Sequence, residues 1–128
     1  MLTNEHQSYI PNTERIAEQN DAFRKAICLG ITPNEALPGR AVTTRAVHDK
    51  GQDFIDKAVA AVGVFDTFDP DNDPDEHHDF GAFDIDDKRL FWKIDLFEIG
   101  TDMRYGAETP DDPSRTERVL TIMLASDW

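Results

Sequence analysis

Apolar residues recur at helical spacing in two stretches of the chain, and each stretch predicts one helix. The first stripe predicts a helix over residues 13–29, which Gly30 is well placed to end. The second stripe is broader, runs from Phe54 to Phe65, and predicts a helix over about residues 52–65. Because each helix has one apolar face, we expect both helices to pack against another layer of the protein.

Alternating apolar and polar residues predict strands, mostly in the second half of the chain. Residues 80–85 and 89–97 flank a short polar break that fits a hairpin turn. Residues 119–125 are apolar on both faces except at Thr121, which is typical of a strand inside a sheet. A shorter, partly β-branched segment over 41–47 predicts a further strand. The strand over 89–97 has one purely apolar face, formed by Leu90, Trp92, Ile94 and Leu96.

These elements predict an α+β fold, with two helices packed on one face of a three- to four-stranded antiparallel sheet. A chain of 128 residues suits one domain and is long enough to bury a core. The first residues are polar and include a proline. We therefore expect a loose N-terminal leader over residues 1–12, followed by a single α+β domain over residues 13–128.

The remaining composition indicates a cytoplasmic protein that does not enter a membrane. No apolar run is long enough to span a bilayer, and the N-terminal residues lack the apolar core of an export signal. The single cysteine, Cys28, excludes an internal disulfide and suits a reducing compartment.

Negative charge is concentrated in the second half of the chain. Residues 1–65 carry seven Lys/Arg against eight Asp/Glu, whereas residues 66–128 carry six against eighteen. The second half therefore holds a net charge of −12 out of a total of −13. Such a field disfavours direct binding to nucleic acid or to an anionic membrane, and it favours cations and basic protein surfaces. Solubility is the simplest alternative explanation of the charge.

The acidic residues are densest in the segment from Asp66 to Asp87, which has ten carboxylates and no Lys or Arg. Carboxylates at this density repel one another, so a folded scaffold, a cation or a basic partner must hold them together. We expect the segment to form a binding surface for a basic partner. The candidate binding residues are Asp69, Asp71, Asp73, Asp75, Glu76, Asp86 and Asp87.

Two physical explanations account for the D-N-D-P part of this segment. Asp and Asn side chains accept hydrogen bonds from backbone N–H groups two residues on, so the motif can build rigid turns without any ion. On this reading Asp71, Asn72, Asp73, His78 and Asp79 are held by backbone hydrogen bonds.

A divalent metal site is the alternative explanation. Asp69, Asp71 and Asp73 have the alternate spacing of the first EF-hand ligands, but Pro74 and Phe80 stand where that motif needs Gly and Glu. An EF-hand is therefore excluded. A less regular Ca²⁺ or Mg²⁺ site would use Asp71, Asp73 and Asp79. We expect no cofactor and favour the turn over the metal.

Five motifs, FDTFDPDNDP, HDFGAFDID, FWKID, RYG and RVLTIMLASDW, resemble those of a small bacterial family catalogued only as a domain of unknown function. The similarity covers about residues 13–128 and includes a D-x-x-R pattern, matched here by Asp21 and Arg24. The chain departs from the family pattern at His77, where the family has Glu before His-Asp-Phe-Gly. The resemblance implies no activity.

Two classes of function fit these observations. The first is a small acidic, non-enzymatic interaction protein that binds a basic partner; its sharpest form is a nucleic-acid mimic that inhibits a defence or nucleic-acid-binding complex. The second is a metal-assisted or His-dependent hydrolase centred on His78 and Asp79. No nucleophile elbow, phosphate-cradling loop or paired zinc-ligand motif occurs in the sequence, which favours the first class. The terminal Trp128 either packs on its own domain or docks into a partner.

Overall fold

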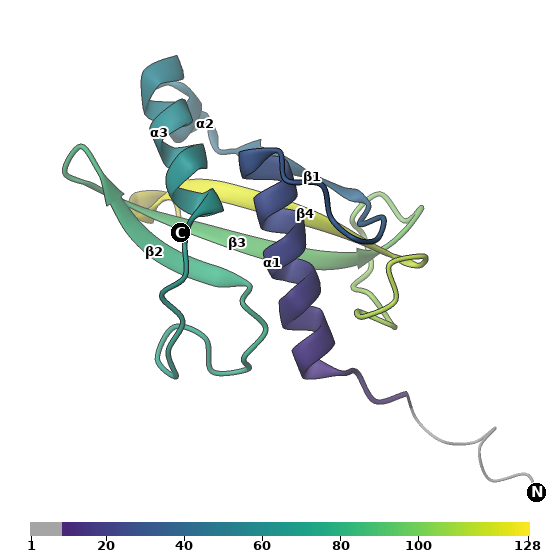
Figure 1. The fold of residues 1–128 in the computed structure, drawn as a ribbon. Coiled ribbons are helices and arrows are strands. Elements are labelled where there is room, and N and C mark those ends of the chain that lie inside the picture. The colour runs from purple at the N-terminus through teal and green to yellow at the C-terminus, as the bar shows by residue number, and fades with distance from the viewer. Residues whose placement is uncertain (1–8) are drawn as a thin grey trace, which may run out of the picture.

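Helices cover one face of a four-stranded sheet in the computed structural model, which describes residues 9–128 (Figure 1). The strands are β1 (Gly39–Thr43), β2 (Phe80–Ile85), β3 (Lys88–Glu98) and β4 (Thr116–Leu124). Their order in the sheet is β1-β4-β3-β2, so the apolar strand β4 is internal as predicted. The predicted α+β class is confirmed. Most of the leader expected over residues 1–12 lies outside the described residues.

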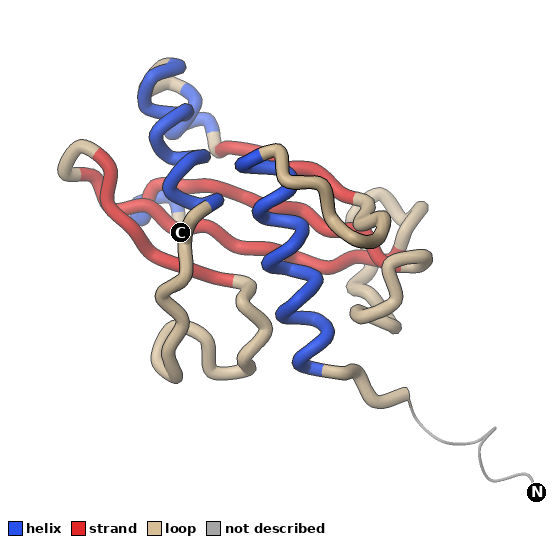
Figure 2. The backbone as a smooth tube through the Cα atoms, viewed as in Figure 1, coloured by secondary structure: helices blue, strands red, loops and turns tan. Residues whose placement is uncertain are grey.

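The first long helix begins and ends where local chemistry favours it. Helix α1 (Thr13–Leu29) starts after Asn12, whose side chain accepts a hydrogen bond from the N–H of Arg15. It ends at Gly30, whose left-handed conformation (φ 73°) turns the chain so that the N–H of Ile31 reaches back to the Lys25 carbonyl. Helix α3 (Gln52–Gly63) stops two residues earlier than predicted. Figure 2 shows both helices in blue on the same side of the red strands.

The sheet is mixed, which corrects the antiparallel sheet that the sequence predicts. β2 pairs antiparallel with β3, and β3 with β4, but the edge strand β1 runs parallel to β4. A parallel pair cannot be joined by a tight turn and needs a long connection between its strands. The long segment between Thr43 and Thr116 provides that connection, because it contains α3 and the β2–β3 hairpin.

The strand predicted over residues 41–47 is also wrong in its second half. Strand β1 ends at Thr43, and residues Arg45–His48 form the short helix α2. The chain turns off the edge of the sheet here, and this turn places the side chain of Val47 in the core, with no exposed surface. Burial of one apolar side chain therefore outweighs the β-propensity of the segment.

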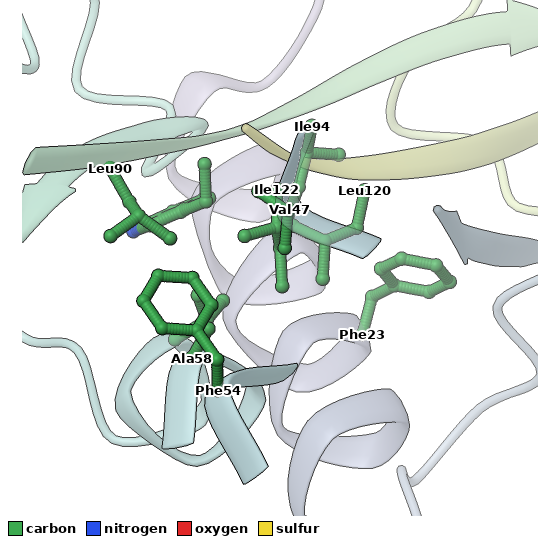
Figure 3. Close-up of a cluster of buried hydrophobic side chains, with 10 residues drawn as sticks. Phe23, Val47, Phe54, Ala58, Leu90, Ile94, Leu120 and Ile122 are labelled. Carbon is green, nitrogen blue, oxygen red and sulfur yellow. The ribbon is translucent and has the colours of Figure 1, made fainter. Parts of the chain in front are cut away.

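The core lies between the sheet and the helices, on the face of β3 that the sequence predicts. Trp92 and Leu90 have no exposed surface, and Leu96 packs at the margin of the cluster. Figure 3 shows how side chains from α1, α3 and the sheet meet there. The buried cluster consists of Phe23, Val47, Phe54, Ala58, Val62, Leu90, Trp92, Ile94, Leu120 and Ile122.

The opposite face of the sheet holds the end of the chain. After β4 a short 3₁₀ helix (η2, Ala125–Asp127) leads to Trp128, which packs edge-on against Phe80 and Phe91 with ring centroids 5.7 Å apart in each pair. Trp128 therefore contacts its own domain, although 72% of it stays exposed. None of the helices in residues 9–128 is long and apolar enough to cross a membrane.

Candidate functional site

A cleft of about 720 Å³ lies between the first half of α1 and residues 66–79, named here the acidic loop. Figure 1 shows this loop beside the N-terminal turns of α1. No Lys or Arg is among the described residues that line the cleft. Six of the lining residues are carboxylates: Glu14, Glu18, Asp21, Asp69, Asp73 and Glu76.

The helical wall of the cleft follows from the two-sided pattern of α1. Ile16 and Phe23 are buried on the side that faces the core. Glu14, Glu18 and Asp21 are spaced four and three residues apart, so they share the side that faces the acidic loop. The sequence analysis named Asp21 only as part of the D-x-x-R pattern and did not place any of the three in an acidic site, because they belong to the nearly neutral half of the chain. Their spacing on a predicted helix is the signal that would have found them.

The acidic loop begins with a tight turn that its own side chains build. Asp69 Oδ1 accepts hydrogen bonds from the N–H groups of Asp71 (2.9 Å) and Asn72 (3.0 Å). The Asn72 side chain accepts one from the Asp69 N–H (3.0 Å) and donates one to the Thr67 carbonyl (2.9 Å). The predicted turn scaffold is thus present, with Asp69 as its main acceptor.

Asp73 is the buried carboxylate of the cleft. Its side chain is only 4% exposed. Its Oδ1 accepts a hydrogen bond from the N–H of His78 at 3.0 Å, which ties the middle of the loop to its C-terminal end. Its Oδ2 lies 3.7 Å from His78 Nε2, beyond hydrogen-bond distance. Within residues 9–128, no donor makes a hydrogen bond to that second oxygen.

His78 joins the loop wall to the helical wall through Asp21. Its Nδ1 lies 2.9 Å and 3.0 Å from the two carboxylate oxygens of Asp21, and its ring stacks on Phe68 with centroids 3.9 Å apart. The sequence analysis grouped His78 with Asp79, but the ring bonds to α1 instead. The two neighbours belong to different parts of the fold. His78 has a left-handed backbone (φ 54°) at the end of the loop, and the Asp79 carbonyl accepts a hydrogen bond from the N–H of Ile94 in β3.

Arg24 holds Asp21, the partner of His78, and links it to α3. Its guanidinium is 1% exposed and donates to the carbonyls of Val62 (2.8 Å) and Gly63 (3.2 Å) and to Asp21 (2.9 Å). It also lies 5.1 Å from the centroid of the Trp92 ring. The D-x-x-R pair therefore connects α1, α3 and the acidic loop. This pair of a buried guanidinium and a partly exposed carboxylate holds both walls of the cleft in place.

The pKa of the Asp79 carboxyl is shifted by burial and by neighbouring charges of the loop. Burial raises the pKa of this carboxyl above its usual 3.8, and the negative charges of Asp73 and Asp75 raise it further. His77 and the backbone N–H of Asp79 lower the pKa but do not cancel the effect of burial. The loop is therefore a place where negative charge is only partly compensated.

No group of three His, Cys, Asp or Glu side chains within residues 9–128 is arranged to hold a metal ion. Asp71 is exposed at the tip of the turn while Asp73 is buried, so the structure does not bring Asp71, Asp73 and Asp79 together as ligands. The arrangement can instead attract a larger cation along the walls of the cleft.

The predicted binding residues fall into two places. Asp69, Asp73 and Glu76 line the cleft, and Asp71 and Asp75 are exposed on the same loop. Asp86 and Asp87 form the β2–β3 turn at the other end of β2, where Asp86 pairs with Lys57 of α3 (3.2 Å). The seven residues therefore do not form one continuous patch on β2 and the acidic loop.

Comparison with known proteins gives one match. A family model described as a protein of unknown function (DUF3768) matches residues 43–127. The matched range includes the acidic loop and strands β2, β3 and β4, whereas α1 lies outside it. No curated protein and no solved structure matches.

Proposed function

The chain belongs to the family described as a protein of unknown function (DUF3768). We propose that it is a non-enzymatic interaction protein whose acidic surface binds a basic partner protein. The observation that carries this proposal is the cleft, where six carboxylates gather and no Lys or Arg lines the walls within the described residues. Asp21 is paired with Arg24, but the other five carboxylates have no Lys or Arg partner within the described residues. Unpaired charges of one sign attract a surface of the opposite sign and speed its encounter with the protein.

The rigidity of the site supports the same proposal. The turn is closed by Asp69 and Asn72, and the loop is bonded to α1 through His78 and through the Asn20 side chain, which donates to the His77 carbonyl at 2.9 Å. A binding surface that is already ordered loses little conformational entropy when a partner docks. Charge needed only for solubility would require no such fixed geometry.

The most specific form of the proposal is a nucleic-acid mimic whose partner is a nucleic-acid-binding protein, in a defence complex or in another nucleic-acid-binding complex. Carboxylates on a rigid surface can take the place of phosphates and use the same Lys and Arg side chains. The net charge of −12 over residues 66–128 supports this form and disfavours direct contact with nucleic acid or with an anionic membrane. A cytoplasmic location belongs to the same proposal.

The test is a competition experiment. An arginine-rich DNA-binding peptide should bind the protein, and the affinity should fall steeply with salt because the contacts are screened over about 10 Å at 0.1 M. Duplex DNA should displace the protein from the peptide, since both compete for the same cationic side chains. Binding that ignores salt, or that persists unchanged with excess DNA, contradicts a nucleic-acid mimic.

A His-dependent hydrolase is the second candidate, and the contact between Asp21 and His78 favours it. A carboxylate that orients an imidazole is the arrangement of a general base. Under this candidate, hydrolysis of p-nitrophenyl ester and phosphate substrates should be measurable and should be lost in His78→Gln. In its metal-assisted form, Mg²⁺, Ca²⁺ or Zn²⁺ should raise the melting temperature and EDTA should reverse the rise.

A further inference from the structure

We propose that the cleft between α1 and the acidic loop receives one arginine side chain of the basic partner, with Asp73 as its anchor. This inference rests on the proposed function, because it names the group on the partner that the acidic surface binds. The ligand class is an alkylguanidinium, which reaches from the open side of the cleft to the buried carboxylate.

The state of Asp73 is the first observation that points to a ligand. The side chain is 4% exposed, yet only one of its oxygens receives a hydrogen bond, from the His78 N–H. The second oxygen has no donor within residues 9–128, and the ring nitrogen Nε2 of His78 stands 3.7 Å away. This second oxygen is not among the fully buried side-chain atoms that lack a partner, and Asp73 lines the cleft. An N–H donor that enters the cleft can therefore reach it and complete the hydrogen bonding of the carboxylate.

The size of the cleft decides between a metal ion and an organic cation. Its volume of about 720 Å³ falls within the range of small-molecule pockets and far exceeds what a bare ion fills. Across the part of the chain that the structure covers, no three acidic or His side chains converge on one point. Carboxylates that are spread along two walls suit a cation with several donors.

Guanidinium satisfies these conditions better than ammonium. Its planar group presents five N–H donors, so one end can bond Asp73 while others face Glu18 on the helical wall. Guanidinium also packs well against aromatic rings, and the stacked rings of His78 and Phe68 form part of the lining. The protein already holds a guanidinium in this way, since Arg24 bonds Asp21 and lies over Trp92.

The experiment titrates N-acetyl-arginine methylamide into the full-length protein and follows backbone amide shifts by NMR. We expect saturable shifts at Asp73, His78 and Glu18, and weaker binding of the matching lysine compound. Asp73→Asn should weaken binding about tenfold, the effect typical of one charge-assisted hydrogen bond. Asp75→Asn, which removes the same charge from an exposed neighbour, is the control and should weaken it far less.

A second variant covers the case in which Asp73→Asn does not fold. Glu18→Gln changes an exposed helical residue and should weaken binding of the arginine compound several-fold while the melting temperature stays the same. Equal binding of the arginine compound by wild type, Asp73→Asn and Glu18→Gln would overturn the inference. Shifts of the same amides with Mg²⁺ or Ca²⁺ but not with the arginine compound would overturn it as well.

An arginine-rich peptide separates this inference from the proposed function. If the peptide binds in a salt-dependent way but Asp73→Asn leaves its affinity unchanged, the anchor is wrong and the acidic surface still binds a basic partner. If neither the peptide nor the arginine compound binds, both proposals fail. Loss of peptide affinity in Asp73→Asn but not in Asp75→Asn supports both.

Discussion

The Asp69 side chain holds the first turn of the acidic loop by accepting two backbone N–H groups. Replacement by Ala leaves both donors without this partner, so Asp69→Ala should lower the free energy of unfolding by about 1–2 kcal/mol, as loss of a helix cap does. Urea denaturation measures the change. Asp71→Ala is the matched control, because the exposed Asp71 side chain makes no hydrogen bond within residues 9–128, and it should change stability by less than about 0.5 kcal/mol. Equal losses in the two variants would show that the turn does not depend on Asp69.

The Asp79 carboxyl provides a second test at the scale of single residues, because its raised pKa makes stability depend on pH. Its pKa in the folded protein is raised above 3.8, mainly by burial, so the folded state holds the proton more tightly than the unfolded state. Its contribution to stability is therefore present below pH 3.8 and is lost as pH rises through the folded pKa. Asp79→Asn removes the buried charge and should make the protein more stable than wild type at pH 7. The difference should shrink as pH falls toward 3.8, and a variant that is less stable at pH 7 would contradict the argument.

At the scale of elements, the sequence predicts best where a local signal marks the boundary. Gly30 marks the end of α1, and the alternation along β3 identifies its buried face. The parallel pairing of β1 and the helix α2 were missed, because both depend on contacts with distant parts of the chain. Strand propensity over residues 41–47 cannot reveal that Val47 is needed in the core.

In the candidate site, too, the sequence predicts the features that depend on neighbouring residues and misses those that depend on distant contacts. The turn at Asp69 and Asn72 follows from residue types that bond their neighbours, so the sequence predicts it. The contact between His78 and Asp21 joins residues that are 57 positions apart, and no local pattern indicates it. The cleft itself exists only because α1 lies beside the acidic loop, which the sequence analysis did not foresee.

The packing of β2 on the core provides a test at the element scale. Gly81 lies so close to Trp92 that an added Cβ would overlap the indole nitrogen, and it would lie 2.6 Å from the ring of Phe65. Gly81→Ala should therefore lower the free energy of unfolding by about 1–3 kcal/mol, as overpacking of a core does. Gly106→Ala is the control, because an added Cβ there meets nothing within 4 Å and the backbone needs no left-handed conformation. Thermal denaturation of both variants measures the difference, and a Gly81→Ala protein as stable as wild type would mean that Trp92 is packed less tightly than the structure indicates.

At the scale of the whole molecule, the cleft combines one wall that lies inside the range matched by the family model and one wall that lies outside it. The loop wall lies within residues 43–127, which match the family model, whereas the helical wall lies in α1 outside that range. The two walls are joined by the bonds of Asp21 with Arg24 and His78. The acidic surface is thus a product of tertiary structure and is larger than the acidic segment of the sequence.

The proposed function depends on where the negative charge lies as well as on how much there is. Asp71, Asp75 and Glu76 are exposed on the acidic loop, and within residues 9–128 their side chains make no hydrogen bond or ion pair. Their replacement by Lys should therefore leave the melting temperature nearly unchanged. A control variant with Asp49, Asp53 and Asp56 replaced by Lys makes the same change of charge just after α2 and on α3. Asp49 pairs with Arg45 and Asp56 accepts a hydrogen bond from Gln52, so circular dichroism must show that this variant is folded before the affinities are compared.

The most direct measurement compares the affinities of these two triple variants for an arginine-rich DNA-binding peptide at low salt. Binding to a specific acidic surface predicts that reversal on the acidic loop abolishes the interaction, while the control reversal just after α2 and on α3 weakens it only slightly. Equal loss in the two variants, with both still folded, would contradict the proposal and leave the acidic residues as a device for solubility.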